Sequence, residues 1–141
     1  MVTEAADVMI RATPQQVWDV LVTFDEYHLW NPFIVEAAGI AEPGRRLRLA
    51  VRRGGIVRYH AVVTAASPAR TLEWAGRLVI PRMFDVRHRF DLQPVVDGTH
   101  VTQSVVFRGL LVAWARDLQD DAARSLDDLN AALRDRVEAV A

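Results

Sequence analysis

The sequence predicts an α+β fold in which an antiparallel β-sheet is combined with one long C-terminal helix. Short segments of alternating apolar and polar residues, separated by turns, fill the middle of the chain. Near the C-terminal end, apolar residues recur at three- and four-residue spacing with no glycine or proline between them. Strands that follow one another so closely must pair antiparallel, because a parallel crossover needs about a dozen residues or more. The 141 residues fit one domain, which we expect to span positions 1–141.

The first third of the chain predicts a strand followed by two short helices. Residues 6–12 alternate between apolar and polar side chains, as in a half-buried strand. Thr13 is suited to an N-cap, and Pro14 suits the first helical position because its φ angle is preset. The second short helix is expected to span residues 24–31. It should end at Asn31, because the residue before a proline avoids the α region.

The central part predicts a series of strands connected by turns. Apolar alternation marks strands near residues 33–40, 47–51, 57–63, 72–78, 84–92 and 101–107. Turn signals separate them at Glu42-Pro43-Gly44, Arg53-Gly54-Gly55, Ser67-Pro68 and Val96-Asp97-Gly98. The segment 78–83, which contains Pro81, is predicted to be a loop or a sheet edge.

A single long helix is predicted from Leu111 to Val137. Its apolar face consists of Trp114, Leu118, Ala122, Leu126, Leu129, Leu133 and Val137. At 1.5 Å per residue this helix would be roughly 40 Å long, enough to cross a small domain.

Composition excludes several classes of function. The chain has no cysteine, so disulfides, thiolate catalysis and cysteine-based zinc sites are impossible. All 17 basic residues are arginine, which excludes a lysine Schiff base. The four histidines have no ligand-like spacing and no glycine-rich phosphate loop is present, so we predict neither a metal nor a cofactor. With a net charge of −1, no signal peptide and no apolar span, the prediction is a cytoplasmic protein with no nucleic-acid partner and no membrane span.

Several motifs occur in an order that resembles a known superfamily. They are Ala12-Thr13-Pro14-Gln15-Gln16-Val17-Trp18, Trp30-Asn31-Pro32-Phe33, Leu72-Glu73-Trp74-Ala75-Gly76, Gly98-Thr99-His100-Val101-Thr102-Gln103 and Phe107-Arg108-Gly109-Leu110-Leu111. Together they span almost the whole chain. The ordered set is similar to the START-like superfamily, also called SRPBCC, and in particular to its polyketide cyclase/dehydrase-like branch.

This resemblance implies the helix-grip fold, in which a curved antiparallel sheet wraps around the long C-terminal helix. It also implies a cavity between sheet and helix that takes a hydrophobic, lipid- or polyketide-like molecule. Members of the superfamily bind lipids, cyclise or dehydrate aromatic intermediates, or assist chaperones, and the fold alone does not choose among these. Three functions therefore stay open: a ligand binder, a cyclase/dehydratase-like enzyme, and a chaperone-activator-type interaction module without a ligand.

The candidate site follows from the inward phase of the strands. Three polar residues share that phase with apolar ones, namely Tyr59, His88 and Gln103. A mostly apolar cavity with a few polar groups is typical of small-molecule sites. The predicted ligand-binding residues are Trp30, Tyr59, Trp74, Phe84, His88, Phe90, Gln103, Phe107 and Trp114.

His88 is the candidate catalytic residue, because it occupies an apolar phase between Val86 and Phe90. One interpretation makes it a group that bonds to, or exchanges a proton with, a ligand carbonyl or hydroxyl. The other makes it a core histidine that is hydrogen-bonded to a neighbour such as Gln103, or a residue at the rim of the cavity in contact with water. The two residues are expected to lie close together if their strands pair across the turn at Asp97 and Gly98.

Arginines gather on the outward phase around two of the predicted turns: Arg45, Arg46, Arg48, Arg52, Arg53 and Arg58. They are interpreted either as a docking patch for an acidic partner or as a solvated sheet face balanced by Glu36, Glu42 and Glu73. The expected assembly is a monomer or a homodimer.

Overall fold

The computed structural model describes residues 2–52, 55–77, 85–109 and 117–141. Within these ranges, seven antiparallel strands form one sheet in the order β1-β7-β6-β5-β4-β3-β2. The strands are β1 (Val2–Ile10), β2 (Ile34–Ala38), β3 (Arg46–Arg52), β4 (Ile56–Ser67), β5 (Thr71–Arg77), β6 (Asp85–Val95) and β7 (Gly98–Arg108). The helices are α1 (Pro14–Val22), the 3-10 turn η1 (Phe24–Glu26), α2 (Tyr27–Trp30) and α3 (Asp117–Val140).

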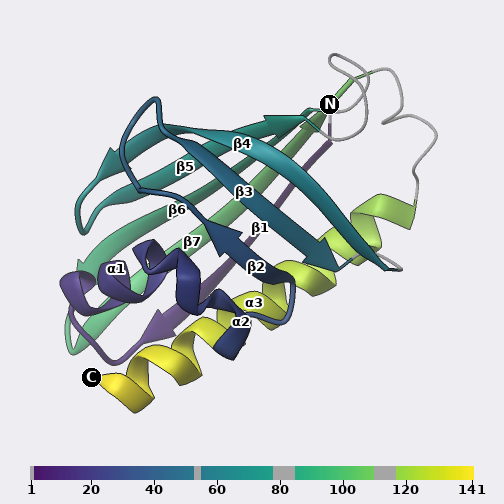
Figure 1. Ribbon diagram of the computed structural model, residues 1–141. Coiled ribbons are helices and arrows are strands. Elements are labelled where there is room, and N and C mark those ends of the chain that lie inside the picture. Colours follow the sequence, from purple (N-terminus) through teal and green to yellow (C-terminus); the bar gives the residue numbers. More distant parts are fainter. Residues whose placement is uncertain (1, 53–54, 78–84, 110–116) are drawn as a thin grey trace.

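The sheet curls around α3, which lies along its concave side, while α1 and α2 lie at one end of the sheet (Figure 1). Leu126, Leu129, Leu133 and Val137 of α3 are all buried, as the apolar spacing predicts. Burial of such side chains supplies much of the stability, at about 1.5–3 kcal/mol for each large apolar side chain. The predicted α+β helix-grip fold is confirmed.

The start of α1 is built as the sequence predicts. The Thr13 hydroxyl accepts a hydrogen bond from the main-chain N–H of Gln16 at 3.2 Å, and the Gln16 side chain accepts one from the N–H of Thr13 at 2.9 Å. This capping box satisfies two donors at the helix start, and Pro14 at the first position needs no acceptor.

The predicted second helix consists of η1 and α2 and ends at Trp30, with Asn31 as its C-cap. The Asn31 side-chain oxygen accepts hydrogen bonds from the main-chain N–H groups of Phe33 and Ile34, at 3.0 and 2.8 Å. Asn31 therefore turns the chain from α2 into β2, which explains its burial without a ligand.

Some predicted boundaries differ from the observed ones. The first strand spans Val2–Ile10 rather than residues 6–12, because its pairing with β7 begins at Val2 and ends at Ile10. The C-terminal helix extends to Val140, and the first part of its predicted range, 111–116, lies outside the described residues. The predicted loop at 78–83 and residues 53–54 of a predicted turn also lie outside them.

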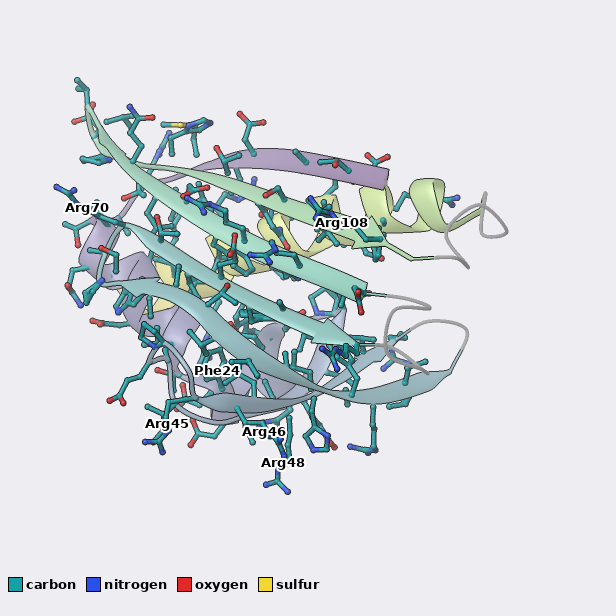
Figure 2. All side chains as sticks on the ribbon, turned by 90° about the horizontal axis from the view of Figure 1, so that it is seen from above. Phe24, Arg45, Arg46, Arg48, Arg70 and Arg108 are labelled. Atoms are coloured by element: carbon teal, nitrogen blue, oxygen red, sulfur yellow. The ribbon has the colours of Figure 1, made fainter. Side chains whose placement is uncertain are left out.

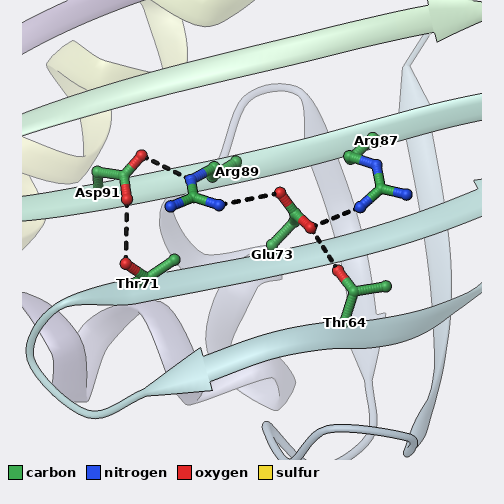
Figure 3. A network of polar contacts seen from close by, with 6 residues as sticks. All are labelled: Thr64, Thr71, Glu73, Arg87, Arg89 and Asp91. Atoms are coloured by element: carbon green, nitrogen blue, oxygen red, sulfur yellow. Dashed lines mark hydrogen bonds and ion pairs between the residues drawn. The ribbon is translucent and has the colours of Figure 1, made fainter.

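A polar network covers the centre of the outer, convex face of the sheet (Figure 3). Glu73 of β5 accepts hydrogen bonds from Thr64 and Arg87, both at 2.7 Å, and from Arg89 at 3.4 Å. Thr64 is the extra residue of a bulge in β4, because Val63 pairs with Trp74 and Ala65 with Glu73. The bulge at Thr64 and the carboxylate of Glu73 together connect β4, β5 and β6 through side-chain hydrogen bonds on this face.

We expect Glu73→Gln to lower the free energy of unfolding by about 2 kcal/mol, because a largely buried carboxylate with charged donors is replaced by a neutral amide. Burial raises the pKa of Glu73, but the bonds from Thr64 and Arg87 outweigh it, so the net pKa is lowered. Urea unfolding at neutral pH measures the effect. The matched control is Glu36→Gln, at an exposed pair with Arg58. The free energy of unfolding of Glu36→Gln should hardly differ from that of the unmodified protein. Equal losses of stability in Glu73→Gln and Glu36→Gln would contradict the prediction.

Candidate functional site

A cavity lies between the concave face of the sheet and α3. Its volume is about 40 Å³, and it is partly open to solvent. The residues that line it are Phe33, Val51, Tyr59, Val86, His88, Val105, Phe107, Ala122, Ser125 and Leu126. Its wall is mostly apolar with a few polar groups, which is the usual character of a small-molecule site. The volume fits a small group or one end of a ligand, since a dry cavity that takes benzene measures about 150 Å³.

His88 is the buried polar residue of the cavity wall, with an exposed fraction of 2%. It stands directly between Trp74 of β5 and Val105 of β7 in the strand register. Its ring stacks on Phe90 with centroids 4.8 Å apart and lies 5.0 Å from the ring of Trp74. Burial lowers the pKa of His88 to about 4, and the hydrogen bond to Gln103 opposes this only in part. The imidazole is therefore neutral at physiological pH.

A chain of buried amides connects His88 to α3. His88 Nε2 lies 2.6 Å from Gln103 Oε1 of β7. Gln103 Nε2 donates to Asn130 Oδ1 at 2.6 Å and to the main-chain carbonyl of Leu126 at 3.3 Å. Gln103 and Asn130 are both buried, with exposed fractions of 0% and 2%. The expected proximity of His88 and Gln103 is thus observed, and the chain continues into the helix.

Tyr59 of β4 lies in the cavity wall because β5 has a glycine beneath its ring. A Cβ atom at Gly76 would lie 2.6 Å from the Tyr59 ring, so only glycine admits the ring in this place. Burial raises the pKa of Tyr59 to about 12, and the nearby Trp74 indole opposes this only in part. The Trp74 Nε1 atom is buried and makes no hydrogen bond of standard geometry.

The structure separates the predicted site residues into groups. Tyr59, His88 and Phe107 line the cavity. Trp74, Phe90 and Gln103 are buried behind the wall, where they contact the His88 ring. Trp30 packs edge-on against Tyr27 at 5.1 Å rather than on the cavity. Phe84 and Trp114 lie outside the described residues.

Sequence reasoning missed the contributions of α3 and of the start of β2. Ala122, Ser125 and Leu126 line the cavity from one face of α3, and Phe33 closes it beside β2. The spacing of three and four residues in α3 is the signal that could have found the helix residues. Asn130 follows Leu126 by four residues and lies on the same face.

The outer face of the sheet carries a larger but open and polar groove of about 880 Å³. Among its lining residues are Arg46, Arg58, Arg77, Arg87 and Arg108. Figure 2 shows Arg45, Arg46 and Arg48 extending outward near β3, far from Arg108. Arg58 pairs with Glu36 at 2.7 Å and Arg45 with Glu42 at 3.9 Å, as expected for a solvated, charge-balanced face. The groove has no enclosed apolar wall, so the smaller inner cavity is the candidate site.

The family is decided by a match along almost the whole chain. Residues 1–136 match the model of the family described as polyketide cyclase / dehydrase and lipid transport. The chain belongs to this family. Among curated proteins, none matches it.

Solved structures with the same fold agree with this family. A START superfamily protein from Mycobacterium smegmatis superposes with a TM-score of 0.81 at 21% identity, covering 99% of both chains. A protein from Thermus thermophilus gives a TM-score of 0.80 at 17% identity, again covering 99% of both. The di-domain ARO/CYC BexL from the BE-7585A biosynthetic pathway gives 0.72 at 15% identity, covering 94% of this chain and 46% of BexL. These superpositions establish the START-like fold, and at such low identities they establish the fold alone.

Two further features bear on the site. The described residues contain no cluster of three or more histidine, aspartate or glutamate side chains that could hold a metal ion. Within the same part of the chain, no helix has the length and apolar character needed to cross a bilayer.

Proposed function

We propose that this family member is a cytoplasmic protein that binds a small hydrophobic molecule, lipid- or polyketide-like, in the cavity between the sheet and α3. The observation that carries the proposal is the apolar cavity with a buried, neutral His88 in its wall. Gln103 bonds one ring nitrogen of His88. A polar atom left without a partner in such a wall is costly, which favours a ligand that bonds to the other nitrogen. The family description, with its polyketide cyclases and lipid transport, supports the same class of ligand.

Binding is better supported than proton-transfer chemistry. A general acid or base works best when its pKa lies near the working pH. Burial lowers the pKa of His88 to about 4 and raises that of Tyr59 to about 12, so both are far from neutrality. Cyclase- or dehydratase-type turnover would therefore have to rely on holding a reactive chain in the right orientation.

The test compares two alanine-to-leucine variants on neighbouring positions of α3. Ala122 lines the cavity, whereas Ala123 does not. Native mass spectrometry of the purified protein should detect a co-purifying small molecule, and Ala122→Leu should lose it because the larger side chain fills the cavity. Ala123→Leu should retain it. Equal occupancy in both variants, or no bound molecule together with no binding of added apolar probes, would favour an interaction module of the chaperone-activator type.

A further inference from the structure

The amide chain behind the cavity fixes the orientation of the Gln103 side chain. One end of this amide lies 3.3 Å from the main-chain carbonyl oxygen of Leu126 and 2.6 Å from Asn130 Oδ1. A carbonyl oxygen can only accept a hydrogen bond. The end of Gln103 that faces Leu126 must therefore be the NH2 group, and the end that faces His88 must be the oxygen.

This orientation in turn fixes the tautomer of His88. Gln103 Oε1 is an acceptor and lies 2.6 Å from His88 Nε2, so Nε2 must carry a proton and donate it. In the neutral ring, the proton on Nε2 leaves a lone pair on Nδ1. Because burial holds the pKa of His88 near 4, this neutral form prevails at physiological pH.

The second ring nitrogen, Nδ1, is the one that the contact with Gln103 leaves for a ligand. Within the described part of the chain, His88 makes its side-chain hydrogen bond through Nε2, which donates to Gln103 Oε1. Gln103 therefore occupies one of the two ring nitrogens of His88 and leaves Nδ1. The ring itself forms part of the cavity wall. Nδ1 is thus the polar atom of this ring that remains for a ligand in an otherwise apolar space.

We infer that His88 Nδ1 is a hydrogen-bond acceptor for the ligand, and that the cavity selects molecules with a hydroxyl or N–H donor over molecules that offer only a carbonyl. This inference rests on the proposed function, because it needs a ligand in the cavity. It assigns a direction to the hydrogen bond: the ligand donates and the protein accepts. A ligand that offers only a carbonyl leaves the Nδ1 acceptor unpaired, and an unpaired buried polar group gives such a site its power to discriminate.

The tautomer is tested first, on the unmodified protein without ligand. A long-range ¹⁵N–¹H correlation spectrum at pH 7 distinguishes protonated from unprotonated ring nitrogens. We expect His88 to have a protonated Nε2 and an unprotonated Nδ1. A proton on Nδ1 with a bare Nε2 would overturn the inference, whatever binds in the cavity.

The ligand preference is tested with three single-ring probes: phenol, which donates, toluene, which is apolar, and acetophenone, which only accepts. Titration of the unmodified protein and of His88→Phe gives the affinity of each probe. We expect the ratio of phenol to toluene affinity to fall about tenfold in His88→Phe, the size of one hydrogen bond. The ratio of acetophenone to toluene affinity should stay unchanged.

Each result separates the inference from the proposed function. If toluene binds but the phenol ratio is the same in both proteins, the cavity binds apolar molecules and the inference is wrong. If none of the three probes binds and no molecule co-purifies with the protein, the proposed function itself fails. Should His88→Phe not fold, the spectrum of the unmodified protein decides instead. The His88 Nδ1 resonance should then shift with phenol and stay in place with toluene and acetophenone, and a resonance unmoved by bound phenol would contradict the inference.

Discussion

Gly98→Ala is expected to lower the free energy of unfolding by about 3 kcal/mol, the upper part of the range for overpacking a tight site. A Cβ atom at this position would lie 2.2 Å from the carbonyl oxygen and 3.1 Å from the carbonyl carbon of Ile10. Both are main-chain atoms at the end of β1, and they cannot rotate away as a side chain can. The tip of the β6–β7 hairpin would have to separate from β1.

That separation affects several contacts at once. Thr99 pairs with Ile10 at the last position of the β1–β7 ladder, and its hydroxyl donates to the carbonyl of Ala12 at 2.8 Å. Both would be strained or lost. Urea unfolding followed by circular dichroism gives the change in midpoint. The control is Gly55→Ala, because a Cβ at Gly55 would meet no atom within 4 Å. If the two variants unfold at the same urea concentration, the close contact at Gly98 does not limit stability.

Part of the candidate site could be predicted from the strands alone. Alternation with a period of two fixes which side chains share a face, and the turn at Asp97 and Gly98 sets the register of the hairpin. These two constraints are sufficient to bring His88 and Gln103 together, and the structure places them in hydrogen-bond contact. Both interpretations of His88 remain compatible with this contact, because it gives a core histidine a partner and leaves the other ring nitrogen for a ligand.

The contributions of α3 could not be predicted in the same way. Helical periodicity identifies the apolar face of α3, but the rotation of the helix against the sheet depends on side-chain packing. The pairing of Asn130 with Gln103 and the place of Ser125 in the wall follow from that rotation. The volume of the cavity depends on the same packing. Similarly, the bulge at Thr64 is a property of the register between two strands, and the alternation of β4 alone does not reveal it.

Trp30 illustrates the limit of reasoning from a resemblance. The motif Trp30-Asn31-Pro32-Phe33 correctly marks the end of the short helix, and the fold suggested that its tryptophan would face the cavity. In the structure Trp30 packs on Tyr27, while Phe33 from the same motif lines the cavity. The packing of Trp30 on Tyr27 leaves Phe33 as the aromatic residue of this motif at the cavity, and the motif alone does not reveal that packing.

The burial of His88 predicts a pH-dependent stability that disappears when the imidazole is removed. Its pKa is about 4 in the folded protein, against 6.5 for an unperturbed histidine. Between these two values the unfolded chain binds a proton that the folded protein does not, so stability falls as the pH is lowered from about 6.5 towards 4. Below the folded pKa both states are protonated and the loss levels off. The total loss is about 3 kcal/mol, from the difference between the two pKa values.

Urea unfolding of the unmodified protein and of His88→Gln, at intervals between pH 4 and pH 7.5, isolates this contribution. Other groups also titrate in this range, but they are common to both proteins and cancel in the difference. The curve of His88→Gln should be flatter by about 3 kcal/mol across the interval, whatever its stability at pH 7. His60→Gln is the control, because His60 is exposed on β4, and its curve should follow that of the unmodified protein. Parallel curves of stability against pH for the unmodified protein and His88→Gln would show that protonation of His88 does not lower the free energy of unfolding. The neutral acceptor nitrogen proposed for the cavity would then lose its physical basis.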